Sequence, residues 1–224
     1  MTVRGIDVAS YQPPTPAVAG NSFVWVKATE GLTYVNPHMA SQAAAARKAG
    51  AVVGFYHFLH PGGIAAQVAH FLKTAPEQAG DMFGCDWETP QPPDKAASSE
   101  EKDQFLRVLK GATKVPHRVV LYCNLDFWLH RDKTSQCGDG LWIADPNSPA
   151  GHPKVQHAWT FHQYGITAGT DQNVGQFADI NSLRAWAGVT LPKPPAGAPA
   201  APTLASLDKR LTSVETRVTA LEKK

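Results

Sequence analysis

The sequence lacks any apolar run long enough to cross a membrane, and it contains few cysteines. No stretch of its 224 residues approaches the ~20 consecutive apolar residues that a transmembrane helix needs. Cys85, Cys123 and Cys137 are too few, and odd in number, for a disulfide framework. We interpret Cys85 and Cys123, which lie inside strand-like runs, as buried thiols. The sequence therefore predicts neither a membrane protein nor a small disulfide-linked one.

The first residues, MTVRGIDVAS, contain no basic region followed by an apolar segment, so we identify no secretory signal. We expect the protein to be made in a cytoplasm and to stay there unless another factor releases it. The body also lacks a basic excess: residues 1–192 carry fifteen Lys/Arg against sixteen Asp/Glu, whereas residues 193–224 carry six against three. Nothing in the body therefore predicts a nucleic-acid partner.

The chain divides at LPKPPAGAPAAP, residues 191–202, where proline prevents regular structure and indicates a semi-extended linker. Beyond it, in residues 203–224, apolar residues alternate at spacings of three and four, which predicts a short coiled-coil helix. These residues are Leu204, Leu207, Leu211, Val214, Val218 and Leu221. Arg210 and Glu215 would then pair between chains, and we favour a homotrimer formed through residues 204–221. The alternatives are a lone amphipathic helix packed on the body and a tail that binds a wall polymer, although the tail has no aromatic residue.

Residues 1–190 form the expected main domain, in which short apolar runs alternate with helical patterns. The strand-like runs are VRGIDVA, FVWVKAT, AVVGFYHF, DMFGCDWE, RVVLYCN, LWIADP and WTFHQYG. Helical patterns occupy residues 36–50, 62–75 and 98–112, the last opening with a capping box of Ser98 and Glu101. This alternation predicts an α/β fold with a parallel sheet or barrel. Because the helical pattern fades after about residue 118, a regular eightfold repeat is not expected.

Polar residues recur at the carboxyl end of nearly every predicted strand, where α/β barrels carry their chemistry. Asp86 and Glu88 are two positions apart, so on a strand they share one face, roughly 6.5 Å apart. Two carboxyl groups in a partly dry site cannot both ionise easily, and one should keep its proton to higher pH. A proton-bearing acid beside an ionised partner suits glycosidic bond cleavage.

The ordered set of motifs across residues 3–180 resembles glycoside hydrolase family 25, the lysozymes that act as N-acetylmuramidases. The motifs that carry the resemblance are GIDVASYQ, FVWVKATEG, AGAVVGFYHF, DWE, VVLYCN, LWIAD and FHQYG, followed by Asp171 in TDQNVGQF. The resemblance implies an irregular TIM-like β/α barrel with the last helices short or missing. The chain departs from the family at His162, where Trp is usual, and after Gln12, where PPTPAVAGN replaces an Asp-Trp segment.

The resemblance also implies roles for individual residues. Glu88 would donate the proton to the leaving sugar oxygen and then activate water. Asp86 would orient or charge-balance the 2-acetamido group of the substrate, whose oxygen is a candidate internal nucleophile. Asp7 and Asp171 would support the floor of the site. The substrate-binding candidates are Tyr56, Tyr11, Gln12, Tyr122, Trp142, Gln163 and Lys27.

Several residues also have plain structural interpretations. We expect His57 to be a hydrogen-bonded core histidine rather than a metal ligand, because His57 and His60 lack the partner spacing of a zinc site. Glu30 is the expected ion-pair partner of Lys27. Trp142 is either barrel core or a ring that stacks on sugars. No metal and no cofactor is expected.

The leading hypothesis is a peptidoglycan hydrolase that cleaves the β-1,4 bond between N-acetylmuramic acid and N-acetylglucosamine. The absence of a signal and the small tail fit a bacteriophage lysin, held in the host cytoplasm until lysis and then acting on the cell wall. The alternatives are a non-catalytic glycan-binding or virion structural subunit and, less well supported, a metal-dependent deacetylase. Bacterial peptidoglycan is the expected partner.

Overall fold

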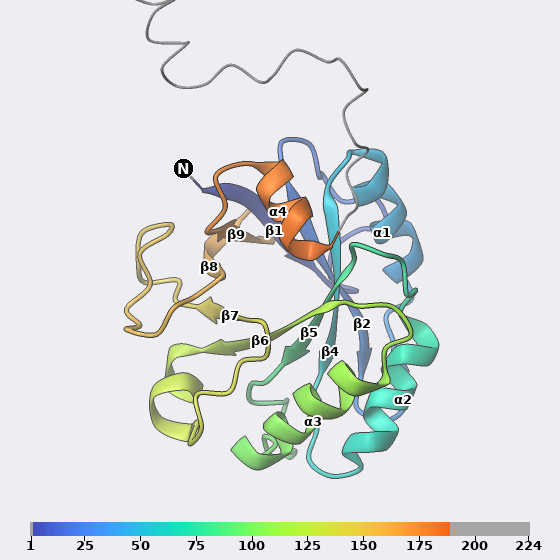
Figure 1. Cartoon of the computed structure of the whole chain (residues 1–224), viewed down its shortest axis with the longest axis vertical. Coiled ribbons are helices and arrows are strands. Elements are labelled where there is room, and N and C mark those ends of the chain that lie inside the picture. The colour runs from blue at the N-terminus through green and yellow to red at the C-terminus, as the bar shows by residue number, and fades with distance from the viewer. Residues whose placement is uncertain (1, 189–224) are drawn as a thin grey trace, which may run out of the picture. The chain divides into compact units, whose positions relative to one another are not determined.

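The strands of the described residues, 2–188, form one sheet whose ends join into a closed barrel in the computed structural model (Figure 1). The linker and coiled-coil helix expected in residues 191–224 lie outside the described residues. In spatial order the ring contains β1 (Val3–Val8), β9 (Thr170–Gly175), β8 (Phe161–Thr167), β7 (Gly140–Ala144), β6 (Arg118–Asn124), β5 (Met82–Asp86), β4 (Val52–Phe58) and β2 (Phe23–Glu30). β2 pairs back to β1, and a short strand, β3 (Tyr34–Val35), pairs with β2 outside the ring.

The barrel is parallel over most of its circumference and closes with an antiparallel hairpin. Every neighbouring pair from β1 through β2, β4, β5, β6 and β7 to β8 is parallel. β9 runs antiparallel to both β8 and β1. The carboxyl ends of the parallel strands therefore meet at one end of the barrel, as the sequence predicts.

Helices accompany the first half of the barrel only. α1 (Met39–Lys48), α2 (Ile64–Thr74) and α3 (Ser99–Ala112) connect the strands from β2 to β6 and pack on the outside of the sheet (Figure 1). The capping box at α3 is present, because Ser98 Oγ accepts from the Glu101 amide and the Glu101 carboxylate accepts from the Ser98 amide. After β6 the only helical elements of the described chain are a π-helical turn, η1 (Phe127–Arg131), and the helix α4 (Ile180–Ala187). This confirms that the last helices are short or missing.

Apolar side chains fill both faces of the sheet. The outer layer lies between strands and helices, whereas the barrel interior is built around stacked aromatic rings, with Trp25 on Trp142 at 4.8 Å. Gly54 makes this stacking possible, because a Cβ there would lie 2.1 Å from the Trp25 ring. Leu183 and Ala187 of α4 join the interior cluster beside residues that begin the strands, so α4 closes the amino-terminal end of the barrel.

Two parts of the fold differ from the sequence-based expectation. Asp171 follows WTFHQYG, the last of the expected strand-like runs, yet it lies in a further strand, β9, which closes the ring. The helix α4 was not expected. All three cysteines are buried and unpaired, as interpreted for Cys85 and Cys123. Among residues 2–188, no helix combines the length and apolar character required to span a membrane.

Candidate active site

A cavity of about 370 Å³ lies at the carboxyl ends of the barrel strands. It is lined by all eleven side chains that the sequence singles out as catalytic or substrate-binding. These are Asp7, Asp86, Glu88, Asp171, Tyr11, Gln12, Lys27, Tyr56, Tyr122, Trp142 and Gln163. Glu30, Phe58, Thr89 and Gln91 also line the cavity. Residues from the seven parallel strands or their following loops, together with Asp171 of β9, therefore converge on one site, as expected for the carboxyl end of a barrel.

Asp7 is held on the cavity floor by two side-chain amides. Asn173 donates to Asp7 Oδ2 at 2.6 Å, and Gln163 donates to the same oxygen at 2.9 Å. Trp142 Nε1 donates to Asn173 Oδ1 at 2.7 Å. Because an indole nitrogen is only a donor, this bond leaves the Asn173 amide nitrogen to face Asp7. The buried Trp142 therefore helps to orient the floor of the cavity.

Asp7 and Asp171 are direct partners across the β1–β9 ladder, an unfavourable arrangement for two like charges. Burial raises the pKa of Asp7 from its ordinary value of 3.8 to about 7, with further contributions from the charges of Asp171 and Glu88. The two amide hydrogen bonds act in the opposite direction, because they favour the ionised form. Burial likewise raises the pKa of Asp171. The cavity floor therefore holds a carboxyl group that titrates near neutral pH.

Asp86 and Glu88 both line the cavity, which confirms that they share a face. Trp87 between them points the other way, into the outer core. Burial and the neighbouring Glu88 raise the pKa of Asp86 well above its ordinary range, and burial also raises the pKa of Glu88. Within the described residues, Asp86 Oδ1 is buried without a hydrogen-bond partner.

Lys27 is the single cationic side chain that lines this cavity in the described residues. Its ammonium group bonds to Glu30 Oε2 at 2.6 Å and lies 4.7 Å from the centre of the Phe58 ring. Its charge lowers the pKa of both Asp86 and Glu88 against the larger effect of burial. Lys27 therefore limits how far burial raises the pKa of Asp86 and of Glu88.

The aromatic candidates occupy different positions around the cavity. Burial and the surrounding carboxylates raise the pKa of Tyr56 and of Tyr122 well above the usual range, so both hydroxyls keep their protons. Tyr122 uses its proton to donate to Gln163 Oε1 at 3.1 Å. Tyr11 is 90% exposed at the rim. Trp142 is 2% exposed, so it is mainly barrel core that reaches the cavity floor.

Other polar residues near the strand ends do not join the site. His57 faces the outer layer and contacts Thr29 Oγ1 at 2.7 Å and Gln67 Oε1 at 3.0 Å. The interpretation of His57 as a hydrogen-bonded core histidine is confirmed, because its side chain is fully buried. Burial lowers the pKa of His57 to about 4. Asp145 accepts from Ser148 and Lys154 and organises the loop after β7.

Sequence reasoning missed Asn173. Its side chain is fully buried and makes the shortest hydrogen bond to Asp7, yet it lies in the polar segment TDQNVG, which has no strand-like apolar pattern. Its position two residues after Asp171 is the only signal available, because residues i and i+2 of a strand share a face.

The chemistry of this arrangement is that of acid–base catalysis. Several carboxyl groups with raised pKa values lie in one recess, where one can carry a proton while an ionised neighbour stabilises positive charge. Within residues 2–188, no cluster of three or more His, Cys, Asp or Glu side chains has the arrangement of a metal site.

Comparison with known proteins gives a consistent set of similarities. The model of the family described as "Glycosyl hydrolases family 25" matches residues 6–172. An N,O-diacetylmuramidase of Chalaropsis sp. is 42% identical over 89 residues, covering 36% of this chain and 42% of the relative. A lysozyme of Streptococcus phage Cp-7 is 25% identical over 198 residues, covering 81% of this chain and 48% of the relative. The chain thus spans less than half the length of these two curated relatives.

Among solved structures, a muramidase from Acremonium alcalophilum superimposes with a TM-score of 0.70 at 26% identity. The match covers 84% of this chain and all of that one. The barrel and its irregular second half are therefore shared along the whole length of that structure.

Proposed function

Because the chain belongs to glycosyl hydrolase family 25, we propose that it hydrolyses the β-1,4 bond between N-acetylmuramic acid and N-acetylglucosamine in bacterial peptidoglycan. The observation that carries the proposal is the convergence of Asp7, Asp86, Glu88 and Asp171 in one cavity. Cleavage of a glycosidic bond requires a proton for the leaving oxygen and negative charge beside the developing oxocarbenium ion. This set of carboxyl groups supplies both.

Glu88 donates the proton to the leaving sugar oxygen and afterwards activates the attacking water. Burial raises the pKa of Glu88, which favours the protonated form that a proton donor requires. Asp86, which lines the cavity, accepts from the N–H of the 2-acetamido group and so directs the acetamido oxygen toward the anomeric carbon. Asp7 and Asp171 bias the floor of the cavity electrostatically. This assignment makes the mechanism substrate-assisted.

The remaining cavity residues bind the sugars. Tyr56 hydrogen-bonds near the reacting ring, and Tyr122, whose proton is committed to Gln163, accepts from the substrate. Tyr11 offers an exposed ring at the rim for stacking on a sugar face. Gln12 joins the rim to the β8–β9 turn by donating to the Gly169 carbonyl at 3.0 Å. Trp142 provides an apolar floor, and Lys27 provides the positive charge.

We further infer that the protein acts as a bacteriophage endolysin, held in the host cytoplasm until lysis and then directed at the cell wall. The similarity to a phage lysozyme supports this origin. Residues 1–190 form the catalytic domain, residues 191–202 the linker and residues 203–224 a coiled-coil helix that trimerises. Light scattering on the full chain and on a Leu211→Asp variant tests the trimer: a monomeric full chain would contradict it.

The decisive experiment is a reducing-end assay on purified peptidoglycan with the wild type and Glu88→Gln. We expect the wild type to release new reducing ends, carried by N-acetylmuramic acid when the products are analysed by mass spectrometry. Glu88→Gln should lose at least about a hundredfold in rate, because general acid catalysis contributes that much or more. Its circular dichroism should match the wild type. Saturable wall binding without new reducing ends would instead indicate a non-catalytic glycan-binding subunit.

A further inference from the structure

Glu88 lies just beyond the end of β5 and has no hydrogen bond of its own to hold it. β5 ends at Asp86, and no side chain or backbone group within residues 2–188 hydrogen-bonds to the Glu88 carboxyl group. The last ladder contact on this side is the Trp87 amide, which donates to the Tyr122 carbonyl of β6 at 2.9 Å. The direction in which Glu88 points is therefore set by the residue that precedes it.

Trp87 is anchored firmly on the outer side of the barrel. Its ring is 1% exposed, and its indole nitrogen donates to the Ala97 carbonyl at 2.8 Å. The ring meets Phe127 edge-on at 4.9 Å between centroids. Because side chains alternate along an extended segment, an outward Trp87 requires Asp86 and Glu88 to face inward.

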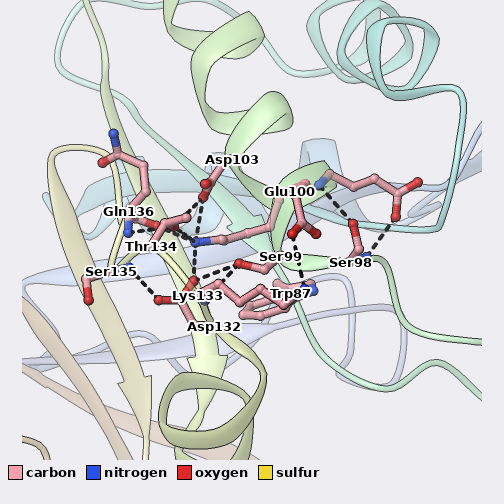
Figure 2. A network of polar contacts seen from close by, with 12 residues as sticks. Trp87, Ser98, Ser99, Glu100, Asp103, Asp132, Lys133, Thr134, Ser135 and Gln136 are labelled. Carbon is pink, nitrogen blue, oxygen red and sulfur yellow. Dashed lines mark hydrogen bonds and ion pairs between the residues drawn. The ribbon is translucent and has the colours of Figure 1, made fainter.

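Lys102 of α3 lies beneath this ring, and its charge is completely buried. The ammonium group is 5.5 Å from the Trp87 ring centroid, within the range of a cation–π contact. It forms ion pairs with Asp132 at 2.6 Å and Asp103 at 2.7 Å, and it donates to the Gln136 carbonyl at 2.8 Å. Figure 2 shows the network that joins α3, through Ser99 and Asp103, to Asp132 and Thr134 of the segment after η1.

A buried ion pair contributes little net stability, since desolvation offsets most of the attraction. It does fix geometry, because hydrogen-bonded charges tolerate less sliding than apolar contacts do. The sequence also places Phe127 and Ala97 against the same ring, so Trp87 is enclosed from several directions. Burial of a tryptophan ring requires only apolar neighbours, whereas the Trp87 ring also has a hydrogen-bond acceptor and a cation beside it.

We propose that Trp87 and Lys102 are positioning residues that hold the Glu88 carboxyl group in the cavity. The proposal rests on the proposed function, in which Glu88 is the proton donor. It assigns a role to a buried lysine that contacts neither the cavity nor any of its lining carboxylates.

The test compares Trp87→Phe and the double variant Lys102→Met/Asp132→Asn with the wild type. The double variant neutralises Lys102 and the buried Asp132 together, so that Asp132 is not left as an unpaired buried charge. Asp103, the other partner of Lys102, is 17% exposed and keeps the hydrogen bond that Thr134 Oγ1 donates to it. Lys110→Met is the matched control, because Lys110 lies on the same helix and pairs with Asp139 away from Trp87. Each protein is assayed on purified peptidoglycan at least about 15 °C below its own melting temperature, which removes unfolding as a cause.

We expect kcat to fall by on the order of tenfold to a hundredfold in both test variants, with KM within about twofold, because displacement by about an ångström costs rates of that size. The control should keep wild-type kcat. Variants that melt at lower temperature but retain wild-type kcat would overturn the proposal and leave a merely structural role.

A second measurement does not depend on activity. Carbon-detected NMR titration of Glu88 should give a lower pKa in Trp87→Phe than in the wild type, because a loosely held carboxyl group gains contact with water. An unchanged titration would overturn the positioning role even if the wild type released no reducing ends. The opposite outcome is an inactive wild type together with a lower Glu88 pKa in Trp87→Phe than in the wild type. That outcome would reject the proposed function and leave the positioning role standing.

Discussion

Asn173 and Asp7 lie on adjacent antiparallel strands, and the Asn173 amide nitrogen is 2.6 Å from Asp7 Oδ2. This bond, together with the one from Gln163, opposes the burial that otherwise favours the protonated form of Asp7. The balance between the two effects gives the site a carboxyl group with a pKa of about 7. Four predictions follow from the geometry of this cavity and its surroundings.

Asn173→Leu should raise the pKa of Asp7, because it removes a donor that favours the ionised form. If ionised Asp7 supports the reaction, the acid limb of the kcat/KM profile moves upward by about one pH unit, equivalent to about 1.4 kcal/mol. The profile is measured on soluble peptidoglycan fragments. Gln172→Leu is the control, since Gln172 points away from Asp7 and bonds to the Thr170 carbonyl. An unmoved acid limb would contradict the proposed role of Asp7.

Lys27→Met should move the entire pH profile of kcat/KM upward. The ammonium group lowers the pKa of both Asp86 and Glu88, so its loss allows both carboxyl groups to keep their protons to higher pH. In the proposed mechanism the acid limb reports ionisation of Asp86 together with Asp7, and the basic limb reports loss of the Glu88 proton. Lys27→Arg keeps the charge and should keep both limbs in place. If Lys27→Met lowers kcat/KM at every pH without moving either limb, the loss is one of substrate contacts instead.

Asp7→Asn should stabilise the protein at alkaline pH. The folded-state pKa of Asp7, about 7, exceeds its ordinary value of 3.8, so the folded state binds this proton more tightly than the unfolded state does. The resulting stability is complete below about pH 4 and is lost as the pH rises toward 7. Asparagine cannot ionise, so thermal unfolding should show a melting temperature above wild type at pH 8 and close to it at pH 4. The difference in unfolding free energy at pH 8 should be on the order of a few kcal/mol. Equal melting temperatures at pH 8 would refute it.

Gly54→Ala should destabilise the barrel, whereas Gly111→Ala should stabilise it slightly. A Cβ at Gly54 would lie 2.1 Å from the Trp25 ring, which is stacked on Trp142 and cannot withdraw. Overpacking of this kind costs about 3 kcal/mol or more. Gly111 lies in α3 with open space around it, and alanine there should add about 0.5–1 kcal/mol. Chemical denaturation compares the two, and a Gly54→Ala variant as stable as wild type would show that the stack can shift.

The parallel half of the fold was predictable because each strand is an uninterrupted apolar run. β4 is buried at every position, as the pattern in AVVGFYHF indicates. The closing strand β9 was missed because it contains Asp171 and Asn173, residue types that are depleted in strands, and only its last three residues are buried. Its strand conformation is imposed by pairing with β1 and β8 rather than by local propensity.

The site was predictable to a similar extent. Polar residues at the ends of apolar runs identified the cavity, since the ends of parallel strands converge. The position of a residue at a strand end does not say which face its side chain occupies. His57 lies in the outer layer, as interpreted, and Asp145 organises the loop after β7. Asn173 was missed because its hydrogen bond to Asp7 depends on β9, a strand that the sequence pattern does not predict. The outward anchoring of Trp87 likewise depends on α3 and η1, which are distant in sequence.

The hairpin that closes the barrel also has a consequence for synthesis on the ribosome. Asp7 emerges early in translation, whereas the two amides that hold it follow 156 and 166 residues later. A nascent chain that has not yet released β9 lacks Asp171, Asn173 and the seam that joins β8 to β1. A nascent chain that ends before β9 therefore has neither a closed barrel nor a complete cavity floor.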